Sequence, residues 1–170
     1  MPANSIFDGQ FLSSRSDSDP ILNVVLHQPE IPGNTGAVGR TCVAIGAKLW
    51  LVRPLGFRID EKTLRRAGLD YWKYLSWEVA NDWQDLVDKM GDRRFWYFSR
   101  FATQNYAQVS FQKNDVLVFG SETSGLPASI TQPNQDKLLR IPTTQNVRSL
   151  NLATSVGISA YEAVRQICLI

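Results

Sequence analysis

Residues 22–52 read LNVVLHQPEIPGNTGAVGRTCVAIGAKLWLV, and this stretch decides the fold. Its first segment, 22–26, is short, rich in β-branched residues and almost entirely apolar, which is typical of a strand covered on both faces. Small and apolar residues then recur at helical spacing over 36–47, where Gly46 marks the end of the helix. Since KLWLV at 48–52 has the character of a second buried strand, the stretch predicts one complete β-α-β unit.

The rest of the chain continues this alternation. Further strands are predicted at residues 94–99, 116–120 and 138–142, and further helices at 61–68, 79–90, 125–130 and 150–167. Strands that alternate with helices predict an α/β fold, with a mostly parallel sheet and helices on both faces. In such a sheet ligands bind outside the carboxyl ends of the strands. The loops that follow strands are therefore the candidate sites.

The length of 170 residues fits one domain. Hydrophobic residues make up 44% and charged residues 20%, which argues against a disordered chain or a coiled coil. Residues 1–20 are polar and lack the basic start and apolar core of a secretory signal, so we expect a flexible extension there and a single domain at 21–170. No apolar run approaches the roughly 20 residues that a membrane span requires, so no membrane partner is expected.

Cysteine and histidine are scarce. Cys42 and Cys168 both lie in apolar surroundings and form no C-x-x-C pair, so neither a disulfide framework nor a zinc site is indicated. With His27 as the single histidine, a multi-histidine metal site is excluded, and His27 itself is interpreted as a polar residue at the sheet edge. These residues predict a protein without a metal in a reducing compartment, the cytoplasm.

The loop after the first strand, PEIPGNTGAVGRT at 29–41, places Asn34 and Gly36 at the start of the predicted helix and Arg40 about one turn later. Folding alone does not require a loop of this composition, which suggests a functional site. The alternative is that Asn34 only caps the helix and that Arg40 is a solvated helix charge.

The next candidate loop, VLVFGSETSGLP at 116–127, follows a buried strand. Glycines at 120 and 125 let the backbone approach a ligand closely. The alternative is an ordinary turn in which Ser124 caps the short helix that follows.

The last candidate loop lies in RIPTTQNVRSLNLATSVGI at 140–158, between a strand that ends at Ile141 and the closing helix. Ser149 is predicted as the N-cap of that helix. A helix N-terminus favours an anion, and Arg148 beside it strengthens this interpretation.

None of these loops contains G-x-G-x-x-G, a P-loop or a nucleophile elbow. A dinucleotide-dependent oxidoreductase would need a glycine fingerprint after the first strand and an acidic residue at the end of the second. The chain has HQPEIPGNTG and Arg53 at these places, which disfavours that class.

The net charge of +2 does not by itself indicate a nucleic-acid partner, but its distribution is uneven. Residues 53–74 contain six basic and three acidic residues, so this stretch carries +3 and the rest of the chain about −1. Arg65 and Arg66 are followed there by Tyr71, Trp72, Lys73 and Tyr74, a mixture of charge and stacking rings that single-stranded RNA favours. A solvated helix face followed by a packed strand gives the same pattern.

Taken together, the three loops resemble the SPOUT class of RNA methyltransferases over residues 22–166. Within that class the chain is most similar to the TrmL or YibK-like group of tRNA (cytidine/uridine-34) 2′-O-methyltransferases. The likeness lies in NVVLHQPEIPGNTG, LRRAGLDYW, FGSETSGLPASI and RSLNLATSVGISAYEA. It implies transfer of a methyl group from S-adenosyl-L-methionine (AdoMet) to the ribose of C34 or U34 of tRNA. Two alternatives stay open: methylation of another tRNA or rRNA site, and a non-catalytic RNA-binding module on the same fold.

The resemblance also implies a C-terminal trefoil knot, a homodimer and a set of site residues. The implied AdoMet contacts are Phe98, Gly120, Glu122, Ile141, Ser149, Leu150 and Asn151, and the implied RNA contacts are Asn34, Arg65, Arg66 and Arg148. A guanidinium with a pKa above about 12 is a poor base, so we expect Arg40 to stabilise the developing alkoxide and to grip the adjacent phosphate. Tyr161 is expected either to position the hydroxyl or to be a core aromatic residue.

Overall fold

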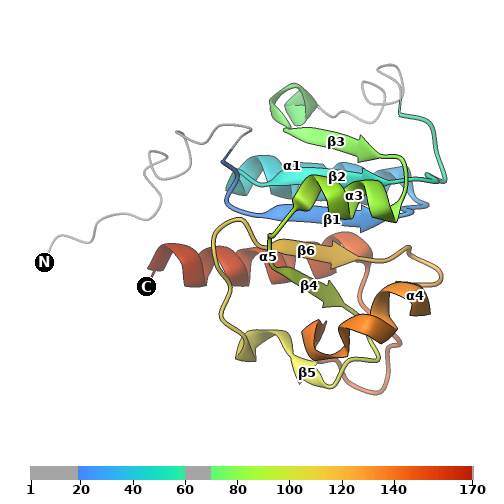
Figure 1. Ribbon diagram of the computed structural model, residues 1–170, viewed down its shortest axis with the longest axis vertical. Helices are drawn as coiled ribbons and strands as arrows, with labels where there is room; N and C mark the ends of the chain where they lie inside the picture. The colour runs from blue at the N-terminus through green and yellow to red at the C-terminus, as the bar shows by residue number, and fades with distance from the viewer. Residues whose placement is uncertain (1–18, 60–69, 170) are drawn as a thin grey trace, which may run out of the picture.

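The computed structural model describes residues 19–59 and 70–169. In this part of the chain seven strands form one sheet in the order β3-β2-β1-β6-β4-β7-β5, and every pairing between them is parallel (Figure 1). The strands are β1 Asn23–His27, β2 Lys48–Val52, β3 Trp77–Ala80, β4 Phe95–Phe98, β5 Gln104–Asn105, β6 Val116–Phe119 and β7 Leu138–Arg140. The predicted parallel α/β fold is confirmed.

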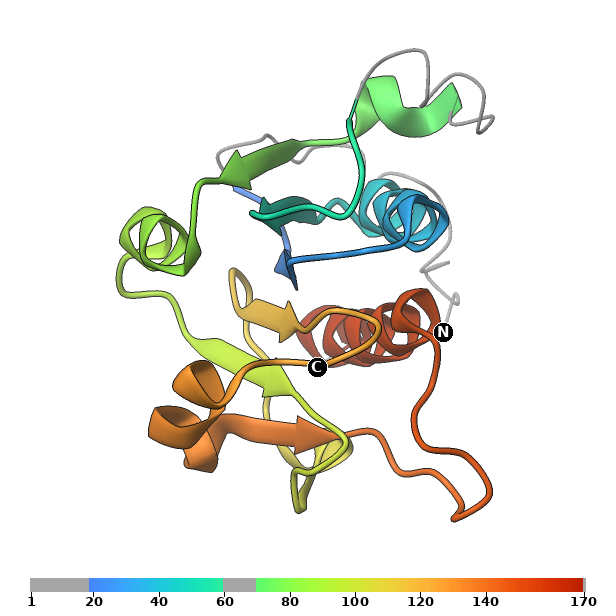
Figure 2. The same ribbon diagram turned by 90° about the vertical axis from the view of Figure 1, so that its right-hand side faces the viewer.

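Helices cover both faces of the sheet (Figure 2). The α-helices are α1 Pro32–Ile45, α3 Trp83–Met90, α4 Ala128–Thr131 and α5 Leu152–Leu169, and the 3-10 helices are η1 Asp70–Tyr74, η2 Tyr106–Gln108 and η3 Gln132–Lys137. Helices α1 and α5 pack on one face, and α3 and α4 pack on the other. No helix among the described residues is long and apolar enough to cross a membrane.

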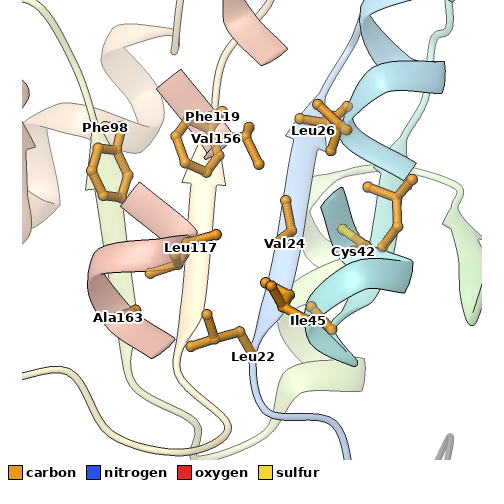
Figure 3. Close-up of a cluster of buried hydrophobic side chains, with 14 of the residues drawn as sticks. Leu22, Val24, Leu26, Cys42, Ile45, Phe98, Leu117, Phe119, Val156 and Ala163 are labelled. Carbon is orange, nitrogen blue, oxygen red and sulfur yellow. The ribbon is translucent and has the colours of Figure 1, made fainter. Parts of the chain in front are cut away.

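The core explains this arrangement. Alternate residues of β1 point to opposite faces, so Val24 packs in the cluster under α1 and α5 while Val25 packs in the cluster under α3. Figure 3 shows Val24 between Cys42 of α1 and the side chains of β6 and α5. Full burial of one such aliphatic side chain stabilises the fold by about 1.5–3 kcal/mol. The apolar run of the first strand is therefore the centre of the molecule.

The starts of two predicted helices differ from the structure by four residues, more than those of α4 and α5. Helix α1 begins at Pro32, four residues before the predicted start, because proline suits the first helical position, where its missing N–H is not needed. The predicted helix at 79–90 is wrong at its start, since β3 occupies 77–80 and α3 begins only at Trp83, behind the N-cap Asp82. As an edge strand β3 is only partly buried, so its sequence lacks the apolar run of the central strands.

The interpretation of His27 as a sheet-edge residue is also wrong. It is the last residue of β1, an interior strand, and only 6% of its surface is exposed. Its ring meets Trp83 edge-on with the centroids 5.9 Å apart, and burial lowers the pKa of the imidazole.

The position of β7 determines where the last part of the chain runs. This strand pairs with both β4 and β5, so the chain returns late to insert between two strands laid down earlier. The segment 141–151 then leads from the carboxyl end of β7 to α5 on the α1 side of the sheet. The trefoil knot stays a prediction that this strand order accommodates.

Candidate functional site

A cleft of about 430 Å³ opens at the carboxyl ends of β4, β6 and β7. This volume lies within the usual range for small-molecule sites. All seven residues that the family resemblance implied for AdoMet line it, namely Phe98, Gly120, Glu122, Ile141, Ser149, Leu150 and Asn151. Asn34 and Arg148, which were implied as RNA contacts, line it too. The three candidate loops therefore form one site.

The loop after β6 folds back on itself, and Gly120 makes this possible. A Cβ atom at Gly120 would lie 2.0 Å from the carbonyl carbon of Gly125 and 2.2 Å from the nitrogen of Leu126, both backbone atoms. The turn is closed by a 2.9 Å hydrogen bond from the Gly125 N–H to the Ser121 carbonyl, and Gly125 adopts the left-handed φ of 70°. The loop itself thus requires glycine at 120, whatever binds beside it. Ser124 belongs to this turn, while α4 has Pro127 as its N-cap, so the interpretation of Ser124 as a cap is wrong.

Glu122 caps the distant helix α1. Its carboxylate accepts hydrogen bonds from the backbone N–H groups of Glu30 at 2.8 Å and Ile31 at 3.2 Å, and from Nδ2 of Asn34 at 3.1 Å. The N-cap residue Ile31 has an apolar side chain and makes no capping hydrogen bond of its own, so the polar group at this end of α1 comes from another loop. A carboxylate at the positive end of the helix is also electrostatically favourable. Glu122 therefore joins the second loop to the first.

The first loop returns the contact. The carboxylate of Glu30 accepts hydrogen bonds from the backbone N–H of Thr123 at 3.1 Å and from its hydroxyl at 2.6 Å. Two neighbouring acidic residues, one from each loop, thus hold the backbone of the other loop. Neither Glu30 nor Thr123 carries a sequence signal for this role, because the partners are 93 residues apart.

Asn34 connects the third loop to this pair. Its Oδ1 accepts a 3.0 Å hydrogen bond from Nδ2 of Asn151. The Oδ1 of Asn151 in turn accepts hydrogen bonds from the N–H groups of Ala153 at 2.8 Å and Thr154 at 3.3 Å. Asn151 is therefore the N-cap of α5, and the prediction of Ser149 for that position is wrong. Asn34 lies inside the first turn of α1 and is not its N-cap, contrary to the alternative interpretation.

Part of the cleft lining is apolar and aromatic. Phe98 stacks on Phe119 with the ring centroids 4.6 Å apart and the planes 10° from parallel, and Leu139, Ile141 and Leu150 line the same cleft. Such a lining, beside the backbone of a glycine-containing loop, suits a ligand with a planar heteroaromatic group.

The mouth of the cleft is cationic. Arg100, Arg140 and Arg148 line it and are exposed. Glu122 is the sole acidic residue among the described residues that line the cleft, and its carboxylate is engaged by α1. The mouth therefore favours a polyanion such as RNA.

Comparison with known proteins identifies the family. Residues 21–161 match the model of the SpoU rRNA Methylase family. The chain belongs to this family. The resemblance noted from the three loops is thereby confirmed, and the oxidoreductase class is excluded.

Individual relatives of this SpoU methylase agree. The chain is 43% identical over 148 residues to the tRNA (cytidine(34)-2'-O)-methyltransferase of Saccharophagus degradans, and the match covers 86% of this chain and 96% of that protein. A solved structure described as giving structural insights into the 2-OH methylation of C/U34 on tRNA is 40% identical, has a TM-score of 0.81, and covers 86% of this chain and 96% of that one. The AdoMet-bound rRNA methyltransferase of Sinorhizobium meliloti is 26% identical with a TM-score of 0.74, over 86% of this chain and 57% of that one.

The two residues expected to act on the ribose lie outside the cleft of the methylase. Arg40 is six residues beyond Asn34, which places it about 9 Å further along the axis of α1. Its guanidinium carbon lies 4.7 Å from the ring centroid of Tyr71, whose hydroxyl donates to the carbonyl of Gly36. Burial raises the pKa of Tyr71, and the nearby Arg40 opposes this shift. Arg40 is thus exposed but oriented by an aromatic ring.

Tyr161 is 54% exposed on α5, so the alternative of a core aromatic residue is wrong. Helix α5 packs beside α1 on the same face of the sheet, which puts Arg40 and Tyr161 on neighbouring helices of the methylase.

The basic and aromatic segment is only partly described. Arg65 and Arg66 lie outside the described residues. Trp72 packs over Gly39 of α1, where an added Cβ atom would lie 2.9 Å from the indole ring. The ring centroids of Trp72 and Trp77 are 5.5 Å apart. With Tyr71 bonded to α1 as well, these two rings attach η1 to the helix, which supports the packing alternative. RNA contact by this segment stays a prediction.

Among the described residues no group of three or more His, Cys, Asp or Glu side chains is placed to hold a metal ion. Cys42 and Cys168 are free thiols.

Proposed function

We propose that this chain is an AdoMet-dependent tRNA methyltransferase that modifies the ribose 2′-hydroxyl of nucleotide 34, C or U. The observation that carries the proposal is the meeting of all seven implied cofactor residues in one cleft with a partly apolar lining and a cationic mouth. The 43% identical relative named for this reaction, and the 40% identical structure concerned with it, support the choice of nucleotide.

The cleft suits AdoMet chemically. The stacked rings of Phe98 and Phe119, with Ile141 and Leu150, offer apolar contact to the adenine, and the backbone of the Gly120 loop offers hydrogen bonds to its edges. When bound, AdoMet supplies a methyl group already activated by its sulfonium. The carboxylate of Glu122 faces α1 and holds the loop in place beside the cofactor. Direct contacts of Glu122, Ser149 and Asn151 with AdoMet stay predictions.

The substrate approaches over the arginines of the mouth. Arg148, beside Ser149 and the start of α5, is the predicted phosphate contact among them. The amide of Asn34 is already bonded on both sides, to Glu122 and Asn151. Its RNA contact stays a prediction, whereas its effect on the shape of the cleft follows from these bonds.

The protein chemistry of the transfer consists of orienting the 2′-hydroxyl and stabilising the oxygen as its proton leaves. Arg40 presents a planar fork of donors that suits both the developing alkoxide and the adjacent phosphate. Because Arg40 and Tyr161 are exposed outside the cleft of their own chain, we propose a cytoplasmic homodimer in which they complete the cleft of the second subunit. Exposed Tyr161 and the open space at Gly157 on α5 leave room for such packing.

The decisive experiment incubates the protein and AdoMet with tRNA whose nucleotide 34 carries either ribose or 2′-deoxyribose. Methylation should occur on the ribose form and be absent from the deoxy form. If the deoxy form is methylated equally well, the target is a base or another nucleotide. Mapping the methyl group on tRNA and on rRNA separates nucleotide 34 from the other sites, and failure to methylate any RNA while still binding it would indicate a non-catalytic module.

A further inference from the structure

The cleft has an aromatic ring at its mouth that neither the family resemblance nor the proposed chemistry uses. Phe101 lines the cleft just beyond the carboxyl end of β4, and 77% of its surface is exposed. It is the most exposed of the large hydrophobic residues in the described part of the chain. A single exposed apolar residue is common and means little alone. The fixed backbone and the cationic neighbours of Phe101 indicate that its exposure has a function.

The backbone around Phe101 is fixed. The N–H of Phe101 donates to Oγ of Ser99 at 3.2 Å, and the N–H of Ala102 donates to the Ser99 carbonyl at 3.2 Å. Ala102 is itself buried in the core under α3. The ring therefore projects from a closed and anchored turn, so presenting it to a ligand requires little loss of backbone entropy.

The ring also has a cationic neighbour. The guanidinium carbon of Arg100 lies 4.5 Å from the centroid of Phe101, and Arg140 and Arg148 line the same cleft. An exposed ring, a guanidinium stacked on it and further positive charge nearby are the combination that binds unpaired nucleotides, through base stacking and phosphate contact. Other rings of the same sheet behave differently: Phe95 stacks on Tyr97 and Phe98 on Phe119 within the fold.

We propose that Phe101, with Arg100, stacks against the base of a nucleotide that flanks the methylated one. The inference rests on the proposed function. The ribose of the target nucleotide must enter the cleft to meet the methyl group, which leaves its neighbours in the chain at the mouth, where Phe101 stands. Stacking has little base preference, so this contact orients the RNA strand and does not select its sequence.

The test uses anticodon stem-loop RNAs that carry the fluorescent base 2-aminopurine at nucleotide 33 or 35, the full-length protein and AdoMet. Binding of the wild-type protein should quench the fluorescence at one of these positions through stacking. Phe101→Ala should abolish that quenching and raise KM for the RNA by about tenfold to a hundredfold, the effect of losing one base-aromatic stack, with AdoMet affinity unchanged. Phe101→Trp should retain both quenching and KM.

Tyr74→Ala provides the matched control, because Tyr74 is 70% exposed with Lys73 Nζ 4.9 Å from its ring centroid but does not line the cleft. It should leave quenching unchanged. If wild-type protein quenches and Phe101→Ala quenches equally, or if Phe101→Ala weakens AdoMet binding instead, the stacking role is wrong. If the wild type gives no quenching at 33 or 35 and methylates elsewhere, the proposed target nucleotide has failed and the stacking partner with it.

Discussion

The carboxylate of Glu122 accepts a 2.8 Å hydrogen bond from the backbone N–H of Glu30, which lies 92 residues earlier in the chain. The same carboxylate holds Ile31 and Asn34, and Asn34 reaches Asn151 at the start of α5. One line of hydrogen bonds therefore crosses all three loops of the cleft. The positions of the loops that would bind AdoMet depend on one another, and this dependence can be measured.

Glu122→Gln should destabilise the protein. The introduced amide nitrogen replaces one carboxylate oxygen and then faces the backbone N–H donor of either Glu30 or Ile31, so at least one hydrogen bond to the end of α1 is lost. Loss of a helix cap costs about 1–2 kcal/mol, and we expect this decrease in the free energy of unfolding by urea denaturation. Glu78→Gln is the control, since the 2.6 Å pair of Glu78 with Lys48 is exposed and should contribute under about 1 kcal/mol. Equal losses in the two variants would show that Glu122 is an ordinary surface carboxylate.

Asn34→Asp should weaken AdoMet binding, because it sets a second carboxylate beside that of Glu122, at a contact that is now 3.1 Å. Combining it with Glu122→Gln restores one donor and one acceptor across this contact. The double variant should therefore be more stable than Asn34→Asp alone by about 1 kcal/mol or more, although each change is destabilising by itself. Calorimetry with AdoMet and urea denaturation report the two effects, and strictly additive losses would mean that the residues do not communicate.

Much of this site could be predicted from the sequence. Parallel strands end at one edge of their sheet, so loops rich in glycine and polar residues after 22–26, 116–120 and 138–142 had to meet there. The roles of individual side chains were harder to predict. An acidic residue in a glycine-containing loop, such as Glu122, is expected to contact a ligand, but Glu122 caps a helix. Only the folded chain shows which distant backbone groups its carboxylate faces.

Other errors have local causes. Ser149 and Asn151 are both good N-cap residues. Which of them caps α5 depends on the residue at which the helix begins after the loop from β7. For Tyr71 and Trp72 the sequence left RNA stacking and packing both open, and only the folded chain shows their contacts with α1. The sequence does not indicate that Phe101 is exposed, because an exposed and a buried phenylalanine after a strand cannot be distinguished from the sequence alone.

Gly120→Ala should disrupt the cleft through the protein backbone. Its Cβ would overlap backbone atoms of residues 125 and 126, which cannot move like the end of a side chain. We expect the free energy of unfolding to fall by about 1–3 kcal/mol, together with loss of AdoMet binding. Gly33→Ala, in the first turn of α1 with nothing within 4 Å of the added atom, should be neutral or slightly stabilising. A stable Gly120→Ala protein that binds AdoMet normally would refute this account of the loop.

Cys42 should be unreactive in the native protein. It is fully buried on the inner face of α1, and burial raises the pKa of its thiol to about 12, so the reactive thiolate is absent near neutral pH. Cys168 is partly exposed. A chromogenic thiol reagent at pH 8 should therefore titrate Cys168 first and Cys42 only after denaturation, and Cys168→Ser should remove the native reaction. Rapid native labelling of that variant would indicate that the core opens at α1.

Arg40 provides the test of the proposed chemistry and assembly together. Arg40→Lys keeps the charge but loses the planar fork, and Arg40→Ala loses both. Because Arg40 does not line the cleft, both variants should bind AdoMet normally in calorimetry. Loss of one preorganised donor at the reacting oxygen should nevertheless slow methylation of tRNA by at least about a hundredfold.

Mixed dimers then show which subunit Arg40 serves. Ile141→Arg should block the cofactor cleft, since Ile141 lines it directly after β7, while leaving Arg40 intact on α1. Each variant alone should be inactive. If Arg40 acts across the dimer, unfolding and refolding the two variants together in equal amounts should restore about a quarter of the wild-type activity, because half of the dimers then contain one intact cleft paired with one intact Arg40. If Arg40 acts on the cleft of its own chain, such mixtures contain no complete site and stay inactive. Light scattering that finds only monomers, with full activity in the wild type, would rule out the shared site altogether.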